Sequence, residues 1–493
     1  MKRIDTIMLL LMLPLLMLPL FIHAQQTMTL TDAIEIAKRG SYASKSAGLS
    51  FLSSYWSFRQ YKASWLPSLN LSGNLMNYNH SIVEARDAQT GRVTYVDNNS
   101  LYNYATLSLN QNLPWADGTV SLRSDLSRFD QFDYNETVYN TTPLLLYYNQ
   151  PLRSYSSMRW NKRTQPLQFE FAKRSYMESM QSLTINVIRY YFNALSAQSN
   201  LKQSTAKHKD LCTLYEKTRR KLELGLVTEG ELLQLELSML NAEMSISYNR
   251  LALENNLFSL FSYLNITDYK DIELVAPTEL PDMSIDCNDV VSRAFTNSTH
   301  SVEQELKMLN ARQNLAYAKA NSGLQVSLQA QVGLTKSADG FRGAYSNLKD
   351  NEIVGITFSL PICDWGLGKG KKRVAKAQLE LTRIQVEQAN IDLEQEIRTT
   401  VMYFNNQAAQ CRISRRALEI AEETYLMAYK RYEKGAMSVT DFNTANNELE
   451  SAQAQYLSQL NTYWSYYYTI QRMTLYDYVN NENIDCDFDE LVK

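Results

Sequence analysis

The sequence is poor in the two residues that most often interrupt regular structure. Its 493 residues include only 16 glycines and 10 prolines. Proline is missing from 167–276 and 362–493, and glycine from 119–224, 371–434 and 436–493. Ordinary globular domains place turn signals far more densely. These stretches therefore predict long helices.

An excess of one charge and a pattern of cysteines are also missing. The formal net charge is −3 and 45% of residues are hydrophobic, which excludes a disordered chain and a basic protein that coats nucleic acid. The five cysteines are odd in number and never form a Cys-x-x-Cys pair, so they indicate neither a disulfide framework nor a metal site. They are Cys212, Cys287, Cys363, Cys411 and Cys486.

No catalytic motif is present. Beyond residue 24 the three histidines, His80, His208 and His300, lie far apart, and neither His-Glu-x-x-His nor Gly-x-Ser-x-Gly occurs. His208 falls at a seam position of a predicted helix, which favours a structural role. The glycine-rich and basic run 366–373 lacks the spacing of a phosphate loop and indicates a turn before a basic helix start. We therefore predict no enzyme, no cofactor and no metal.

The first 24 residues have the pattern of an export signal. Residues 1–24 contain two basic residues, an apolar run and a small residue, and polar Gln25 follows. Pro14 and Pro19 break the apolar run, which disfavours a retained anchor. After residue 24 there is no run of eighteen apolar residues, so we expect no transmembrane helix.

Two parts of the sequence resemble each other when one is shifted along the chain by either of two offsets. An offset of 210 places Pro151 on Pro361 and Gly225 on Gly435. An offset of 257 matches a second set of residues: Asp32, Ala37, Lys62, Ala63 and Leu71 fall on Asp289, Ala294, Lys319, Ala320 and Leu328. We infer an internal duplication whose first half carries 47 surplus residues, the difference between the two offsets.

Each half alternates between strand and helix periodicity. Residues of period two predict strands at 69–75, 144–148, 324–331 and 354–360, and a further hairpin, 105–111 with 119–128, in the surplus. Heptad-like spacing predicts long helices of coiled-coil type, including one over 152–224. The predicted seams of these helices include Leu211, Tyr425, Ala428 and Tyr432. Shorter helices are predicted at 31–64, 229–265, 288–322 and 439–476, stacked in pairs to match the long ones.

Glycine and capping residues mark where the long helices turn back. Gly225 and Gly435 end the long helices, and Thr228 and Ser438 start the next ones. Glu231 and Asp441 follow at the third helical position, a capping-box spacing to which Asp441 is a weaker fit.

The predicted strands cannot close a barrel within one chain, because about eight strands are the usual minimum. An open sheet edge is not tolerated in lipid, so several chains must contribute to one barrel. Aromatic residues that suit membrane interfaces surround the strands: Trp65, Tyr78, Tyr95, Tyr102, Tyr104, Trp115, Tyr147 and Tyr148.

With its duplicated plan, its Pro-x-x-Asp-Trp-Gly turn at 361–366 and its tips at 225–231 and 435–441, the mature chain resembles the TolC family of outer-membrane efflux proteins. The resemblance implies a mainly α protein with membrane strands: a long antiparallel α-helical coiled-coil barrel in the periplasm and an outer-membrane β-barrel shared by a homotrimer. It also implies a periplasmic adaptor (membrane fusion) protein and an inner-membrane transporter of RND or ABC type as partners, and contact with outer-membrane lipid. No nucleic acid is implied.

The organisation that follows has five parts. They are a signal peptide at 1–24, a first repeat at 25–265 with its hairpin region at 66–150, an equatorial linker at 266–287, a second repeat at 288–476 with its hairpin at 324–360, and a C-terminal tail at 477–493.

The resemblance assigns roles to the tips. Adaptor docking falls on Gly225, Leu226, Val227, Thr228, Gly435, Ala436, Met437 and Ser438. The periplasmic gate falls on Asp441, Thr444 and Glu231, although Thr444 stands where some members carry a second Asp. That departure argues against a strong acidic ring, and Asp441 and Glu231 at the least cap their helices.

Two further questions stay open from the sequence. The surplus either adds two strands per chain, giving 18 instead of 12 in a trimer, or forms an external loop or plug. A soluble exported coiled-coil scaffold is the alternative function, and it leaves the strands without a purpose. An exported enzyme is disfavoured because no catalytic cluster is present, and the cargo is not indicated.

Overall fold

The computed structural model describes most of the chain, and the predicted signal peptide lies outside the described part. The described residues are 26–86, 88–267, 272–277, 280–281 and 283–492. The chain forms two compact units, which we call the helical unit and the sheet unit. The helical unit comprises Met1–Ala47, Ser179–Val290 and Ile397–Ile484, and the sheet unit comprises Gly48–Glu178, Val291–Glu396 and Asp485–Lys493.

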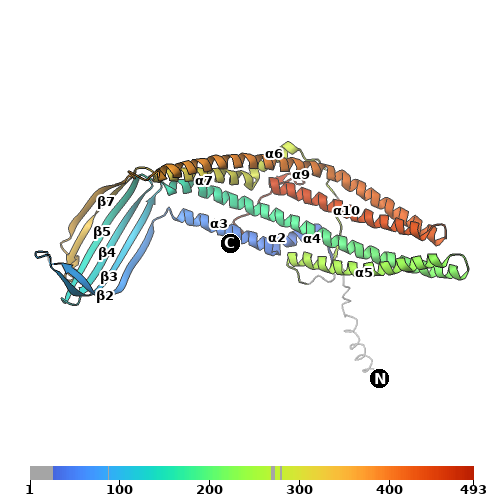
Figure 1. Cartoon of the computed structure of the whole chain (residues 1–493), viewed down its shortest axis with the longest axis horizontal. Helices are drawn as coiled ribbons and strands as arrows, with labels where there is room; N and C mark the ends of the chain where they lie inside the picture. Colours follow the sequence, from blue (N-terminus) through green and yellow to red (C-terminus); the bar gives the residue numbers. More distant parts are fainter. Residues whose placement is uncertain (1–25, 87, 268–271, 278–279, 282, 493) are drawn as a thin grey trace, which may run out of the picture. The chain divides into compact units, whose positions relative to one another are not determined.

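Helices dominate the described residues (Figure 1). Two of them, α4 and α9, have 67 residues each, and the helices that follow them, α5 and α10, have 36 each. None of the described helices combines the length and hydropathy that a membrane crossing requires. Their bounds are α2 Leu30–Gly40, α3 Tyr42–Ala63, α4 Ser157–Glu223, α5 Glu229–Leu264, α6 Cys287–Asn297, α7 Thr299–Asn321, α8 Phe341–Ala344, α9 Leu367–Glu433 and α10 Val439–Thr474.

The predicted start of the first long helix is wrong. Residue 152 lies in strand β5 (Glu136–Arg153), whose ladder with β7 (Gln325–Ala338) continues to Arg153. Helix α4 begins only at Ser157, after Ser156 Oγ accepts a hydrogen bond from the Arg159 amide at 3.1 Å. Interstrand pairing, which the heptad pattern cannot reveal, therefore decides this boundary.

The shorter helices predicted at 31–64 and 288–322 are each broken once. The breaks fall at Ser41 and Ser298, which are 0% and 4% exposed and stand 257 residues apart. Ser41 Oγ accepts from the Ser44 amide at 3.1 Å, and Ser298 Oγ donates to the Ala294 carbonyl at 2.6 Å. A buried hydroxyl thus satisfies backbone groups that a break exposes, a role that short polar side chains often take.

The core of the helical unit lies between the α4–α5 and α9–α10 hairpins. It includes predicted seam residues, among them Leu211, Ala428 and Tyr432, which confirms that part of the heptad pattern. Its buried members are Leu211, Leu214, Leu235, Ala242, Ala428, Tyr432, Val439, Phe442 and Ala445.

A short parallel ladder joins the N-terminal strand of this unit to the predicted linker. Strand β1 (Gln26–Met28) pairs with β6 (Ile272–Leu274) inside the predicted linker. The buried hydroxyl of Tyr191 lies 2.8 Å from the Met28 carbonyl oxygen and 2.7 Å from that of Val275. Burial raises the pKa of Tyr191, so this side chain stays a neutral link between the two strands.

The sheet unit holds one antiparallel sheet of six strands in the order β2-β3-β4-β5-β7-β8 (Figure 1). All four single strands predicted from period two are present. The predicted extra hairpin is present as well, as β3 and β4, which turn at Asp117 with a φ of +58°. The surplus is therefore part of the sheet and not a plug. The remaining strands are β2 Ser68–Arg86, β3 Val93–Leu113, β4 Gly118–Gln131 and β8 Lys349–Ser359.

The tail is ordered at two points. Strands β9 (Tyr476–Asp477) and β10 (Glu482–Asn483) form a small hairpin in the helical unit. In the sheet unit the Phe488 ring lies 5.0 Å from that of Phe51.

Candidate functional site

One face of the six-stranded sheet is apolar and exposed. The pairing register sets Leu69, Leu109, Leu122, Leu146 and Val332 side by side across five strands. Directly opposed residues of an antiparallel pair point to the same face. Ten large apolar side chains on this face, which we call the apolar face, are 38–76% exposed: Leu69, Leu71, Leu107, Leu109, Leu122, Leu146, Val332, Val354, Ile356 and Phe358.

The opposite face, called here the polar face, carries hydrogen-bonded polar side chains. Ser121 Oγ donates to Asn110 Oδ1 at 2.7 Å, and Asn110 Nδ2 donates to Ser108 Oγ at 3.2 Å. Thr106 Oγ1 donates to Asp125 Oδ1 at 2.5 Å. The Ser121–Asn110 and Thr106–Asp125 contacts join β3 to β4, so the extra hairpin shares the polar face as well as the apolar one.

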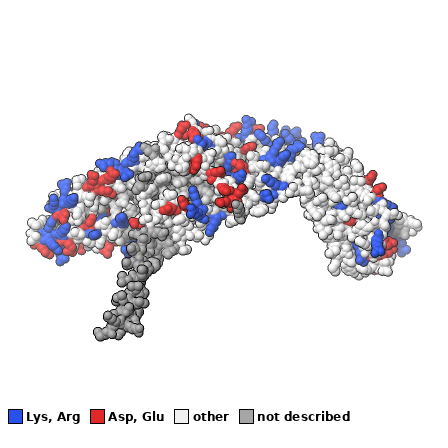
Figure 2. Space-filling model, turned by 180° about the vertical axis from the view of Figure 1, so that it is seen from behind, with Lys and Arg blue, Asp and Glu red and all other residues white. Residues whose placement is uncertain are grey.

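Charged residues are sparse on the sheet surface that Figure 2 shows. On the side shown in Figure 2, the sheet surface is mostly uncharged between its far end and a group of basic residues over the start of α9. Lys369, Lys371 and Arg373 are exposed there. The predicted glycine turn precedes them, with Gly366 at a φ of +87° and its amide bonded to Asp364 Oδ1 at 3.0 Å.

Both outer edges of the sheet are open. Among the described strands, β2 pairs only with β3, and β8 only with β7. A face of exposed leucines and two open edges would favour aggregation in water. The sheet is therefore built to be covered and continued by something else.

The two hairpin tips share one geometry. Gly225 and Gly435 adopt φ values of +69° and +77°, and their amides bond to the Leu222 and Tyr432 carbonyls, both at 2.8 Å. A side chain at either glycine would be strained, which explains glycine as the stop signal. Of the predicted docking residues, Val227 and Met437 are half-buried and six are exposed: Gly225, Leu226, Thr228, Gly435, Ala436 and Ser438.

The structure places each predicted gate residue in a bond within its own helix. Glu231 forms a full capping box with Thr228, accepting from its amide at 3.4 Å and donating its own amide to Oγ1 at 3.3 Å. Asp441 accepts only from the Ser438 hydroxyl, at 2.8 Å, while its amide bonds to Ser438 Oγ. Thr444 Oγ1 donates to the Thr440 carbonyl at 3.0 Å.

Polar contacts between the two hairpins were not predicted. The Tyr425 hydroxyl on α9 donates to Asp210 Oδ2 on α4 at 2.6 Å, and Lys207 Nζ lies 3.0 Å from Glu450 Oε1. Lys217 forms an ion pair with Glu433, whose carbonyl also accepts from Lys221 Nζ at 2.7 Å. We call these contacts the hairpin links.

The contacts between the hairpins shift the pKa values of the residues that form them. Burial raises the pKa of Tyr425, and the hydrogen bond to Asp210 raises it further. The hydrogen bond from Lys217 lowers the pKa of Glu433, and the same bond raises the pKa of Lys217. Sequence periodicity places Tyr425 on a seam, but it does not tell which helix lies across that seam. The sequence therefore gives no sign that Asp210 is the partner of Tyr425.

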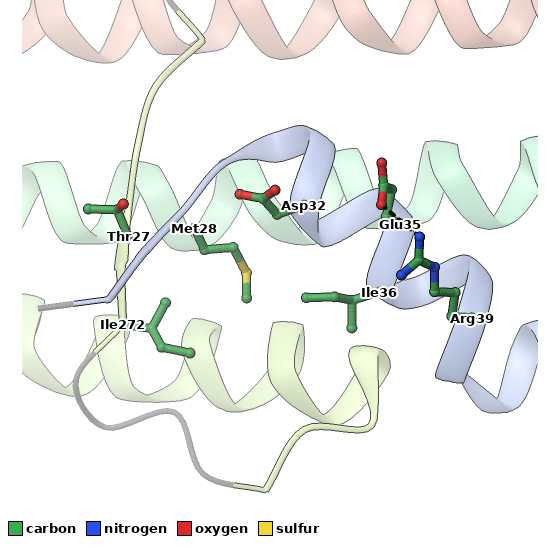
Figure 3. A pocket seen from close by; sticks show the side chains of 7 residues that line it. All are labelled: Thr27, Met28, Asp32, Glu35, Ile36, Arg39 and Ile272. Atoms are coloured by element: carbon green, nitrogen blue, oxygen red, sulfur yellow. Dashed lines mark hydrogen bonds and ion pairs between the residues drawn. The ribbon is translucent and has the colours of Figure 1, made fainter.

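The helical unit also has small surface openings. One, of about 270 Å³, lies beside the β1–β6 pair and α2. Glu35 and Arg39 lie side by side in Figure 3, and they form an ion pair with 3.2 Å between Arg39 Nη2 and Glu35 Oε2. Asp32 caps α2 by accepting a hydrogen bond from the Thr29 amide. His208 is half-buried beside Cys212, in keeping with the structural role predicted for it. Within the described residues, no three metal-ligating side chains gather.

A family model described as outer membrane efflux protein matches residues 104–265 and 290–474. The chain belongs to this family. The family resemblance predicted from the sequence is confirmed, and with it the location: the protein resides in the outer membrane, with its helical part in the periplasm.

Relatives of the efflux-protein family agree with this assignment. Outer membrane protein TolC of Escherichia coli strain K12 is 22% identical over 314 residues, which cover 58% of this chain and 62% of TolC. The Campylobacter jejuni CmeC outer membrane channel superposes with a TM-score of 0.65 at 16% identity, over 94% of this chain and 89% of CmeC. VceC of Vibrio cholerae gives 0.61 at 15%, over 92% and 97%. These structural likenesses show the fold.

Proposed function

We propose that the protein is one subunit of a homotrimeric outer-membrane efflux or secretion channel. The observation that carries the proposal is the six-stranded sheet with an exposed apolar face, a hydrogen-bonded polar face and two open edges. Three copies joined edge to edge would close a barrel, with the apolar face in lipid and the polar face around water. Channel proteins of the same family and fold support this assignment.

Transport through such a tube needs no chemistry on the solute. A water-filled lumen lets polar and amphiphilic solutes cross the lipid layer, and closure at the helical tips prevents leakage. We propose that the hairpins part when a partner binds the open tips better than the closed ones. The hairpin links are the contacts that such a partner has to outweigh.

The partners belong to the same proposal. A periplasmic adaptor would dock on the exposed tip residues, and an inner-membrane transporter of RND or ABC type would supply cargo. The internal duplication fits this arrangement, because it gives one chain two similar helical hairpins. Isolating the protein with its native transporter would identify both the pump class and the cargo.

The test measures assembly and conduction on the same preparation. We expect the purified protein in detergent to have the mass of three chains and to form discrete conducting steps in planar bilayers. Lone subunits that leave lipid vesicles no leakier would refute the proposal. They would support the alternative, a soluble exported scaffold, against which the exposed apolar face already argues.

A further inference from the structure

We propose that the β3–β4 hairpin widens the outer-membrane exit to 18 strands, so that the channel passes bulky hydrophilic solutes that a barrel without this hairpin would exclude. The inference rests on the proposed trimer and concerns the class of its cargo. It is argued from the sheet of this chain alone.

The second half of the chain shows how the first half would look without the inserted hairpin. Leu71 of β2 corresponds to Leu328 of β7 at the offset of 257, and Pro151 of β5 corresponds to Pro361, just after β8, at the offset of 210. The second half thus contributes one hairpin, β7–β8. The first half inserts two strands, β3 and β4, between the equivalents of that pair.

Both inserted strands lie fully within the sheet. Strand β4 pairs with β3 along its whole length, from Ser100↔Gln131 to Leu113↔Gly118, without a register shift. At the end near the helices, Gln111 Nε2 donates to the Trp65 carbonyl and Asn112 Nδ2 to the Ser64 carbonyl, each at 3.0 Å. Arg159 lies 3.6 Å from Asp117 at the turn. The hairpin is therefore held at the level of its neighbours.

Strand number sets the width. With strands about 4.8 Å apart and tilted by about 40°, 18 strands give a backbone diameter of about 36 Å and 12 strands about 24 Å. A side-chain layer of about 5 Å on each wall leaves open widths of about 26 Å and about 14 Å. The two extra strands per chain thus nearly double the open width.

The inserted strands do not refill the space that they create. Near the helices their polar face carries five small side chains, Thr106, Ser108, Asn110, Thr119 and Ser121, together with Asp125 and the longer Arg123. The Arg123 guanidinium lies 5.3 Å from the centre of the Tyr147 ring on the neighbouring strand, so this long side chain is held along the wall. The short helix α8 packs on the other side, where the Phe341 ring lies 6.1 Å from that of Tyr139. Tyr139 pairs with Arg128, and Arg128 pairs with Asn103. Asn103 lies on the same face of β3 as Leu107 and Leu109, so Tyr139 is on the apolar face.

The experiment measures the widest reagent that enters the barrel from outside. A reporter cysteine is introduced by Gln329→Cys on the polar face of β7, with the exposed Cys363 removed by Cys363→Ser. Maleimide-linked polymers of graded hydrated diameter are added to vesicles or cells from the exterior. We expect the full chain to be labelled by polymers up to about 20 Å wide, below the open width of 18 strands.

A deletion and a matched control isolate the hairpin. Asn79, Ser100, Gln131 and Glu136 lie in one register row, so removal of 80–135 with an Asn-Gly turn from Asn79 to Glu136 joins β2 directly to β5. This variant should be labelled only by reagents narrower than about 14 Å, the width estimated for 12 strands. Removal of 81–98 shortens two strands but keeps six, and should leave the cut-off unchanged.

Each outcome decides one claim. A full chain that forms conducting trimers yet admits no reagent wider than about 14 Å would overturn this inference and leave the channel function standing. Absence of trimers and of conductance would instead remove the proposed function itself. If the long deletion fails to assemble, the cut-off of the full chain and a count of 18 strands by electron microscopy decide the question.

Discussion

At the scale of single residues, Asp441 unites a role that the structure shows with one that the family resemblance implies. It accepts a hydrogen bond from the Ser438 hydroxyl at the start of α10. In the proposed trimer, the resemblance places it at the periplasmic gate. We expect Asp441→Ala to leave assembly intact and to alter the single-channel conductance. Asp441→Asn keeps an acceptor for the cap and removes only the charge, so it separates the two roles.

The outcome for Asp441 is read from currents and stability together. Asp441→Ala keeps the capping bond from its backbone amide to Ser438 Oγ and loses only the bond from the Ser438 hydroxyl to the carboxylate. That loss costs about 1 kcal/mol in local stability, measurable by hydrogen exchange at the tip. If both variants conduct like the unmodified protein, Asp441 is no part of the gate. Asp32→Ala is the matched control, because it removes the same kind of carboxylate from the capping box of α2, where the Thr29 hydroxyl donates to Asp32 Oδ2 at 2.7 Å, away from the predicted gate.

Tyr425 is the residue whose loss should open the tips most directly. Its half-buried hydroxyl donates to Asp210 at 2.6 Å, and Tyr425→Phe removes this bond with little change in packing. A hydrogen bond to a charged group contributes about 1.5 to 3 kcal/mol. Since about 1.4 kcal/mol changes an equilibrium constant tenfold, we expect the ratio of open to closed channels in planar bilayers to rise about tenfold or more. Asp210→Ala should act in the same direction, and the double variant should add little to either.

A current trace from Tyr425→Phe that matches the unmodified protein would show that this hydrogen bond does not hold the hairpins. The comparison is clean because the aromatic ring, which lies 5.8 Å from that of Phe442, stays in place.

At the scale of whole elements, the contact between the α4–α5 and α9–α10 hairpins should weaken in acid. The hydrogen bond from Lys217 lowers the pKa of Glu433 below its ordinary value of roughly 4.3. The ion pair therefore contributes fully above that ordinary value and is lost as the pH falls through the lowered one. We expect channel opening to rise at pH 3 to 4 relative to pH 7, at roughly constant ionic strength.

Glu433→Gln tests the assignment of this acid response. The variant should conduct at neutral pH as the unmodified channel does in acid, with a smaller further change on acidification. The Glu433 carbonyl still accepts from Lys221, so the variant removes the carboxylate while one link remains. An acid response equal to that of the unmodified channel would assign it to other groups.

Some elements could be predicted from sequence because their signals are local. Glycine at positive φ and a hydroxyl that caps the next helix fixed the tips at Gly225 and Gly435. The break at Ser41 and the late start of α4 were missed, since a buried serine and a continuing strand ladder leave the apolar pattern unchanged. The hairpin links were missed for the same reason: they depend on which helices are neighbours.

At the scale of the whole molecule, the sequence predicted six strands or four with equal support, because period two shows that a strand exists but not what it pairs with. The register settles the matter: Leu109 and Leu122 stand between Leu69 and Leu146. Pairing makes the sheet wide, and two open edges make it incomplete. The proposed closure by copies of the chain therefore rests on the sheet as a whole and on no single residue within it.

The proposed orientation of this sheet in lipid yields a final prediction from two adjacent residues. Leu71 is 76% exposed on the apolar face, and Ser72, next along β2, lies on the polar face. An arginine facing lipid near the midplane costs about 2 to 4 kcal/mol, whereas a lumen position tolerates it. Leu71→Arg should thus reduce the yield of membrane-inserted, heat-resistant trimer, while Ser72→Arg should insert normally and shift ion selectivity toward anions. If Ser72→Arg blocks insertion and Leu71→Arg does not, the apolar face points into the lumen and the proposed barrel is inside out.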